Sequence, residues 1–316
     1  KKKYPNKRQG HSVLGCVIRR YTSCRDYPMR RCCLVYVLFL ALLPGLNAQQ
    51  YEDYLYEGDA SVFYAETKQI NQFFRRFNCE EAPNGERYFS THPMYRNREM
   101  RQKYISELFD LVNPSLEDSL KQSFIQHVTR KRTPLFLDFH AGEWFAELST
   151  TFRYKGREEE AIFFLRLREE TIGSKWVFSH VYFRPYYKRS SLPDTSRLYL
   201  PSGVRDPMGF MHPMSHELAF MNVRKVFNDR ENISQYMDPD EGTTMMKLFL
   251  YEVYKSKLRF KTVKKVKFHF FQIDNWYFEL AQFRRSGYNR GWLISQLSEL
   301  PEDKKSMLKR FIYRRE

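Results

Sequence analysis

The sequence predicts an α+β fold of two related domains, each with amphipathic helices packed on a curved antiparallel β-meander. Stretches of helical periodicity precede stretches of strand periodicity, and this order occurs twice along the chain. A proline-rich segment without periodicity separates the two occurrences. The 316 residues are 42% hydrophobic and include 27 Phe and 22 Tyr, enough apolar material for one large or two medium cores. This composition excludes collagen, low-complexity disorder and a disulfide-dense miniprotein.

Residues 29–48 have the pattern of a secretory signal peptide. Two arginines follow Met29, an apolar run covers 32–43, and a Pro-Gly break leads to the small residue Ala48. The apolar run is shorter than a membrane span requires. We therefore expect export to the periplasm or the extracellular space; the alternative is an uncleaved N-terminal anchor.

We interpret residues 1–28 as mis-annotated upstream sequence, since they would bury the signal peptide inside the chain. Cleavage after the signal gives a mature chain that begins at Gln49 and has no transmembrane span. Of the five cysteines only Cys79 then remains, so no intramolecular disulfide can form in the mature chain.

The N-terminal domain is predicted to span residues 49–190. Its first part has three apolar stripes at helical spacing, with Ser115 as a candidate N-cap of the third helix. From residue 134 the apolar period changes to two, which predicts an antiparallel meander. The three stripes are Phe63, Ile70, Phe74 and Phe77; Met100, Tyr104, Leu108 and Leu111; and Leu120, Phe124 and Val128. The expected strands are 134–140, 144–154, 159–170 and 175–183.

Residues 191–214 are predicted to be a stiff proline-rich connector, and residues 215–316 a C-terminal α+β domain. Ser215 and Thr243 can cap its two helices, and Pro301 opens a final helix that carries Leu308, Phe311 and Ile312. The expected strands are 257–263, 266–273, 276–285 and 292–297.

The two halves are similar at an offset of 116 residues. Segment 164–181 then lies over segment 280–297, and several apolar positions coincide. Three residues are identical under this offset: Arg168, Trp176 and Ser179 match Arg284, Trp292 and Ser295. Together with the repeated element order, this similarity favours a tandem repeat of one α+β domain.

In element order, both halves resemble the nuclear transport factor 2-like cone fold, which is also the fold of SnoaL-like cyclases. The resemblance rests on helices followed by a meander that ends in long strands, and on no signature motif. It implies a conical cavity, which holds a ligand in some members and is filled by side chains in others.

The positive charge is concentrated at two places. Of the formal net charge of +16, residues 1–48 carry +9 and residues 191–316 carry +7, while residues 49–190 are neutral. In the C-terminal domain, cations alternate with apolar residues, which places them on one face of consecutive strands. We predict a binding face for an anionic partner there; a merely solvated face with edge lysines is an equal alternative. Its residues are Lys257, Arg259, Lys261, Lys265 and Lys267.

Asp138 and His140 are the weak catalytic candidates, because residues two apart on a strand point to the same side. In the cone-fold enzymes a His–carboxylate pair in the cavity transfers protons, which is what the resemblance implies for this pair. A solvated face or a loop anchor is the competing interpretation.

The sequence contains no phosphate-binding glycine loop, nucleophile elbow or metal-binding motif, so we predict no cofactor and no metal. The leading hypothesis is an exported, non-enzymatic scaffold or binding protein of the bacterial cell envelope. Its expected partner is an envelope protein or an anionic envelope component rather than nucleic acid. The rival hypothesis is a small-molecule enzyme or ligand carrier that uses a cavity of the first domain with Asp138 and His140.

Overall fold

The computed structural model describes residues 69–170, 173–188, 193–201, 211 and 221–313. Residues 58–316 form one compact unit, and all described residues belong to it. The upstream sequence, the signal peptide, the stripe residue Phe63 and the candidate cap Ser215 lie outside the described residues.

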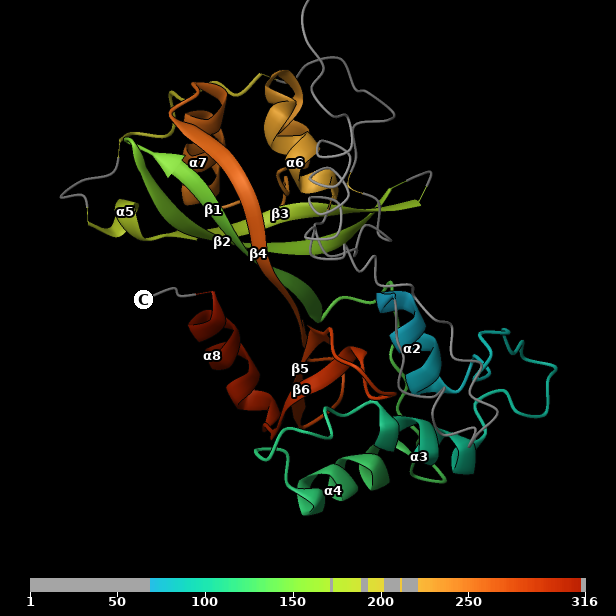
Figure 1. Cartoon of the computed structure of the whole chain (residues 1–316). Helices are drawn as coiled ribbons and strands as arrows, with labels where there is room; N and C mark the ends of the chain where they lie inside the picture. The colour runs from blue at the N-terminus through green and yellow to red at the C-terminus, as the bar shows by residue number, and fades with distance from the viewer. Residues whose placement is uncertain (1–68, 171–172, 189–192, 202–210, 212–220, 314–316) are drawn as a thin grey trace, which may run out of the picture. The chain divides into compact units, whose positions relative to one another are not determined.

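The protein is mixed α and β, with one six-stranded antiparallel sheet in the order β3-β2-β1-β4-β5-β6 (Figure 1). Each half contributes a three-stranded meander, in which sequence neighbours pair with each other as their short connections require. The bounds are β1 Trp144–Tyr154, β2 Arg157–Glu170, β3 Gly173–Phe183, β4 Leu258–Phe270, β5 Trp276–Phe283 and β6 Gly291–Glu299.

The two meanders join along β1 and β4 in the middle of the sheet. These strands pair antiparallel over their whole length, from Trp144 opposite Phe270 to Tyr154 opposite Leu258. Two related domains, each with a sheet of its own, are therefore not shown. The strands on either side of the predicted connector form one sheet instead.

Strand β4 corrects the expectation of two strands that break at Lys264 and Lys265. It is continuous, and it absorbs two extra residues as bulges, Lys261 and Lys264, where the register against β1 shifts. A bulge bends a strand and redirects side chains without ending the pairing. The apolar alternation is interrupted at these positions for that reason.

Segment 134–140 is not a strand, although its residues alternate. It runs as an irregular segment that is fixed by Asn78, whose side chain accepts from the Leu137 amide at 3.0 Å and donates to the Leu137 carbonyl at 2.8 Å. A side-chain amide that pairs with both backbone groups substitutes for a neighbouring strand.

The helices of the first half cover the strands of the second half. These helices are α2 (Ile70–Asn78), α3 (Arg98–Glu107) and α4 (Asp118–Val128); Glu117 rather than Ser115 is the N-cap of α4. Phe73, Phe77 and Phe124 all contact Phe278 of β5, with ring centroids 5.7 to 6.4 Å apart. In Figure 1 these helices lie beside β5 and β6.

Conversely, the helices of the second half cover the strands of the first. They are α6 (Met221–Asn228), the 3₁₀-helix η2 (Arg230–Tyr236) and α7 (Thr244–Tyr254), which Thr243 caps as predicted. Phe227 and Phe249 each contact Phe152 of β1 and Phe163 of β2, at 5.0 to 5.3 Å between centroids. The helices are thus exchanged between the halves.

Helix α8 (Glu302–Ile312) covers the opposite face of the sheet, and a single turn, α5 (Arg184–Tyr187), follows β3. Lys305 of α8 is buried and donates to the carbonyls of Phe271 at 2.8 Å and Ile273 at 2.9 Å. A second apolar cluster forms under α8 from Phe145, Ile162, Phe164, Phe271 and Tyr277. We call this side of the sheet the α8 face.

Candidate anion-binding surface

Strand β1 shows which side chains share the α8 face. Its pairing with β2 has no register shift, so its side chains alternate regularly. Phe145, Ser149 and Arg153 therefore lie on the α8 face, while Trp144, Leu148 and Phe152 enter the large core. Arg153 at the far end of this row is exposed.

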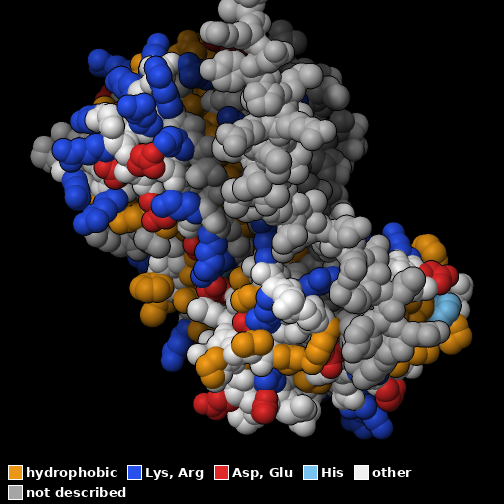
Figure 2. Space-filling model, viewed as in Figure 1, with side chains coloured by type: hydrophobic (Ala, Val, Ile, Leu, Met, Phe, Trp, Pro, Cys, Tyr) orange, Lys and Arg blue, Asp and Glu red, His pale blue; other side chains and the backbone are white. Residues whose placement is uncertain are grey.

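Cations of β4 continue this row. Arg259 lies opposite Arg153 in the register, and Lys265 lies opposite Ser149. Figure 2 shows Lys and Arg side chains gathered over this end of the sheet, near the place where β4 begins. We define the basic surface by its exposed members: Arg153, Lys257, Arg259, Lys261, Lys264 and Lys265.

Two members of the basic surface are neutralised by acids of β2. The bulged Lys261 forms an ion pair with Glu158, and the bulged Lys264 lies 3.8 Å from Glu160. The hydrogen bond and charge of Lys261 hold the pKa of Glu158 below its ordinary value. These pairs are solvent-exposed and contribute little stability.

Arg153 and Arg259 are different, because like charges directly opposite each other on adjacent strands destabilise a sheet. Among the described residues, neither arginine forms an ion pair with an acid, and neither do Lys257 and Lys265. Arg153 also lies opposite Glu158 of β2, and its charge contributes to the lowered pKa of that carboxyl, so Glu158 compensates part of its charge. Arginine side chains suit phosphate, sulfate or carboxylate groups, and the cations of this surface outnumber the two acids that pair with them.

Lys267, which the sequence places on the exposed binding face, belongs instead to a buried polar network. Its Nζ donates to Glu279 Oε2 at 2.7 Å, and that carboxylate is only 8% exposed. Tyr277 donates its hydroxyl to Glu279 Oε1 at 2.9 Å. Lys267 is therefore needed to compensate a buried charge.

His269 links this network to β1. Its Nε2 lies 3.1 Å from Glu147 Oε2, and its Nδ1 lies 2.9 Å from the Tyr277 hydroxyl. Burial, together with the charge of Glu279, raises the pKa of Tyr277. The network joins β1, β4 and β5, so it fixes their register from the α8 face.

The structure does not pair the side chains of Asp138 and His140. Asp138 Oδ1 accepts from the backbone amide of His140 at 2.8 Å, while the imidazole Nδ1 lies 3.1 Å from Ser174 Oγ. Both residues are exposed. Such an aspartate, bonded to the backbone two residues on, is the geometry of a turn.

Cys79 is buried where α2 ends and takes a left-handed conformation there. Burial raises the pKa of its thiol to about 11. The thiolate required for nucleophilic chemistry is therefore scarce at neutral pH.

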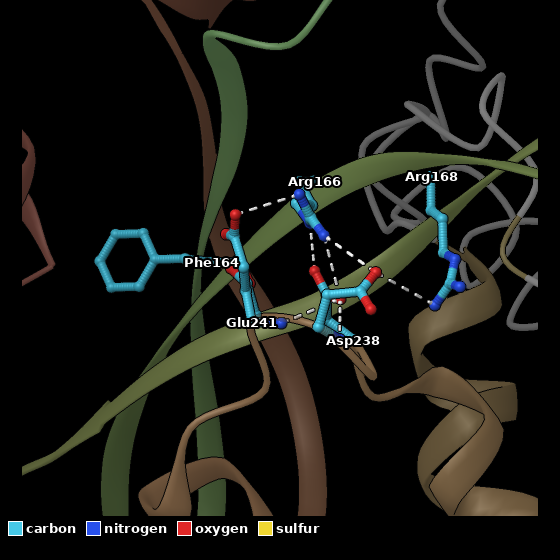
Figure 3. A network of polar contacts seen from close by, with 7 residues as sticks. Phe164, Arg166, Arg168, Asp238 and Glu241 are labelled. Atoms are coloured by element: carbon cyan, nitrogen blue, oxygen red, sulfur yellow. Dashed lines mark hydrogen bonds and ion pairs between the residues drawn. The ribbon is translucent and has the colours of Figure 1, made fainter.

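A cavity of about 470 Å³ lies at the outer edge of β3. Beside it, Arg166 and Arg168 of β2 face Asp238, Asp240 and Glu241 in the loop before α7 (Figure 3). The cavity is lined in part by His180, Tyr187, Asp240, Thr243, Met245 and Tyr313. Asp240 and Glu241 in this lining form ion pairs with Arg166 and Arg168, so the cavity lining does not indicate a charged ligand.

Arg153 and Lys264 are surface residues that sequence reasoning missed. Arg153 was overlooked because residues 49–190 are neutral as a whole, and only the pairing of β1 with β4 brings it next to Arg259. The available signal was the regular alternation of segment 144–154, which places Arg153 on the outward side.

The chain matches no family model, no curated protein and no solved structure at a significant level. The resemblance to the cone fold therefore stays a prediction. Within the described part of the chain, no helix is long and apolar enough to span a bilayer.

Proposed function

We propose that this protein is an exported, non-enzymatic binding protein of the cell envelope that docks an anionic partner through the basic surface. The observation that carries the proposal is the excess of cations where β1 meets β4: Arg153 lies opposite Arg259, and Lys257 and Lys265 form no ion pair with an acid among the described residues. Glu158 lies opposite Arg153 but also pairs with Lys261, so it does not balance both arginines, and like charges opposite each other favour the binding of a further anion. Export rests on the signal-peptide pattern of residues 29–48.

The experiment compares two triple variants of equal net charge on immobilised heparin, a soluble polyanion that serves as the probe. The first is Arg153→Glu, Arg259→Glu and Lys265→Glu. The second reverses exposed cations elsewhere: Lys131→Glu, Arg132→Glu and Arg197→Glu. Lys267 stays unchanged because its loss would expose the buried charge of Glu279.

We expect the basic-surface variant to elute at clearly lower salt than the wild type and the control variant. The basic N-terminal residues are common to all three chains, so they cannot cause a difference between the two variants. Because Arg153→Glu faces both Glu158 and Arg259→Glu, the basic-surface variant is expected to lose some stability, and urea unfolding is measured for both variants so that elution is compared only where each is folded. Equal elution of the two triple variants would refute the proposal.

We also propose that the two halves are related α+β units that share one sheet. The register shifts of β2–β3 and β5–β6 fall at Ser179 and Ser295, which are equivalent at the offset of 116 residues. Ser179 Oγ donates to the Phe164 carbonyl, and Ser295 Oγ donates to the Glu279 carbonyl in the neighbouring strand. A duplicated unit accounts for the repetition of this contact.

The outer edges of the sheet support the same proposal. Phe178 of β3 forms a parallel bridge with Met237, and the equivalent Ile294 of β6 forms one with Phe109. In both bridges the partner outside the sheet is followed by a buried aspartate that pairs with an arginine. Asp238 follows Met237 and pairs with Arg166, and Asp110 follows Phe109 and pairs with Arg285.

A further inference from the structure

Helix α8 has an apolar side that faces the solvent. Its inner side is accounted for, since Leu308 and Ile312 pack on the cluster of the α8 face. Met307 and Phe311, by contrast, are 69% and 77% exposed. They are four residues apart and so lie one above the other on the helix surface. Phe311 thus faces the solvent, unlike Leu308 and Ile312, which the sequence assigns to the same helix.

These two side chains project from the same side of the sheet as the basic surface. Helix α8 lies over Phe145, and Tyr313 at its end contacts that ring at 4.8 Å between centroids. Ser149 lies four residues after Phe145 on the same face of β1, which is about 13 Å along the strand at about 3.3 Å per residue. Ser149 pairs with Lys265 of the basic surface.

The outward side of α8 therefore stands above the sheet by about the width of a helix, 10–12 Å. In Figure 2, apolar side chains lie close below the cluster of Lys and Arg, at the position that α8 occupies in Figure 1. Exposed Lys304 and Arg310 flank Met307 and Phe311 on the helix itself, and exposed Asp303 lies one turn before Met307. Protruding apolar side chains among cations are typical of proteins that lie on a membrane surface.

We propose that α8 and the basic surface together dock this protein on an anionic lipid surface, with Met307 and Phe311 inserted between the lipids. This inference rests on the proposed function and names the partner of the same surface. Cations contact the lipid phosphates, while the apolar pair enters the boundary between headgroups and acyl chains. A glycan or other soluble polyanion offers no apolar phase, so it would leave Met307 and Phe311 exposed.

The experiment places a tryptophan reporter at residue 311 of the full chain. The four native tryptophans are each at most 4% exposed, so the added emission is separable as the difference from the wild type. Phe311→Trp is compared with Phe89→Trp, because Phe89 is 66% exposed and lies in a loop after α2. Both variants are titrated with vesicles of phosphatidylcholine, with and without phosphatidylglycerol, and with brominated lipid as a quencher.

We expect a blue shift and quenching at residue 311 only, and only with phosphatidylglycerol present. The apolar run at residues 32–43 is present in both variants, so it cannot produce a difference between the two positions. Quenching at 311 should be lost when Arg153, Arg259 and Lys265 are changed to Glu. Met307→Ser with Phe311→Ser should leave the elution from heparin unchanged.

Three results would overturn the proposal: no quenching at 311 on anionic vesicles, equal quenching at 89 and 311, or quenching at 311 that persists after the charge reversal. The heparin elution distinguishes the proposed anionic docking surface from the proposed lipid partner. If charge reversal lowers that elution but residue 311 is never quenched, the basic surface binds a soluble polyanion or an acidic protein, and only the lipid partner is refuted.

Discussion

At the scale of single residues, Asp238 shows how a fully buried carboxylate is kept charged. Burial alone raises its pKa, but the hydrogen bonds from Arg166 and from the amides of Asp240 and Glu241 prevail, and the pKa lies below its ordinary value. Two nitrogens of Arg166 hold both carboxylate oxygens (Figure 3). This contact fixes the loop before α7 to β2.

Asp238→Asn should lower the free energy of unfolding by about 2 kcal/mol at pH 7, because hydrogen bonds to charged groups contribute about 1.5–3 kcal/mol. A depressed carboxyl pKa stabilises the fold above the unfolded-state value, and this contribution disappears as the pH falls through the folded-state value. The difference between wild type and variant should therefore shrink below about pH 4.

Urea unfolding at pH 7, 5 and 3 measures this dependence. Asp240→Asn is the matched control, since Asp240 lies 3.7 Å from the same Arg166 but is 65% exposed. The control should stay within about 0.5 kcal/mol of the wild type. A loss for Asp238→Asn that is equal at all three pH values would contradict the assigned cause.

At the scale of elements, Arg101 explains why α2, α3 and α4 pack as one group. Its side chain extends from α3 and is 1% exposed. It donates to the carbonyls of Phe77 in α2 and Val128 in α4, each at 2.9 Å, and also to that of Leu135. The last carbonyls of a helix have no partner within the helix, so one guanidinium satisfies acceptors of two helices at once.

Arg101→Lys should lower the free energy of unfolding by at least about 2 kcal/mol, because an ammonium group cannot reach three acceptors with the geometry of a guanidinium. Arg98→Lys is the control. Arg98 also donates to a helix-end carbonyl, that of Thr129 at 2.8 Å, but its side chain is 38% exposed. Urea unfolding of the two variants should differ by more than about 1 kcal/mol; similar losses would show that Arg101 has no special role.

At the scale of the whole molecule, the exchange of helices makes the two halves depend on each other. Phe278 of β5 is covered by Phe77 and Phe124 of the first half, and Phe163 of β2 is covered by Phe249 of the second. Removal of either half would expose these rings and the central edge of the remaining meander. We therefore predict that the two predicted domains on either side of the connector fold together rather than as independent units.

Limited proteolysis within 191–214 should cut the chain without separating the halves. We expect two fragments on a denaturing gel that co-elute in native size-exclusion chromatography, because the β1–β4 pairing and the exchanged helices hold them together. Each half expressed alone should be insoluble or unfolded, since it would expose a large apolar surface. Fragments that separate under native conditions would instead support two independent domains.

The sequence alone determined the features that depend on local periodicity. The alternation of residues 144–154 predicted β1 with its observed bounds, and Thr243 was identified as the cap of α7 because a threonine before an apolar helical stripe satisfies backbone amides locally. The cations of β4 were recognised for the same reason, since period two assigns side chains to a face without knowledge of the partner strand.

What those elements contact depends on how distant segments pack against them. The choice of β4 as the partner of β1 depends on residues more than 100 positions apart, and no local pattern encodes that choice. It brought Arg153 opposite Arg259, moved Lys267 into a buried network and left Phe311 on the outside of α8. A period assigns a residue to one side of its own element; whether that side meets solvent, an opposite charge or a core depends on packing against distant segments.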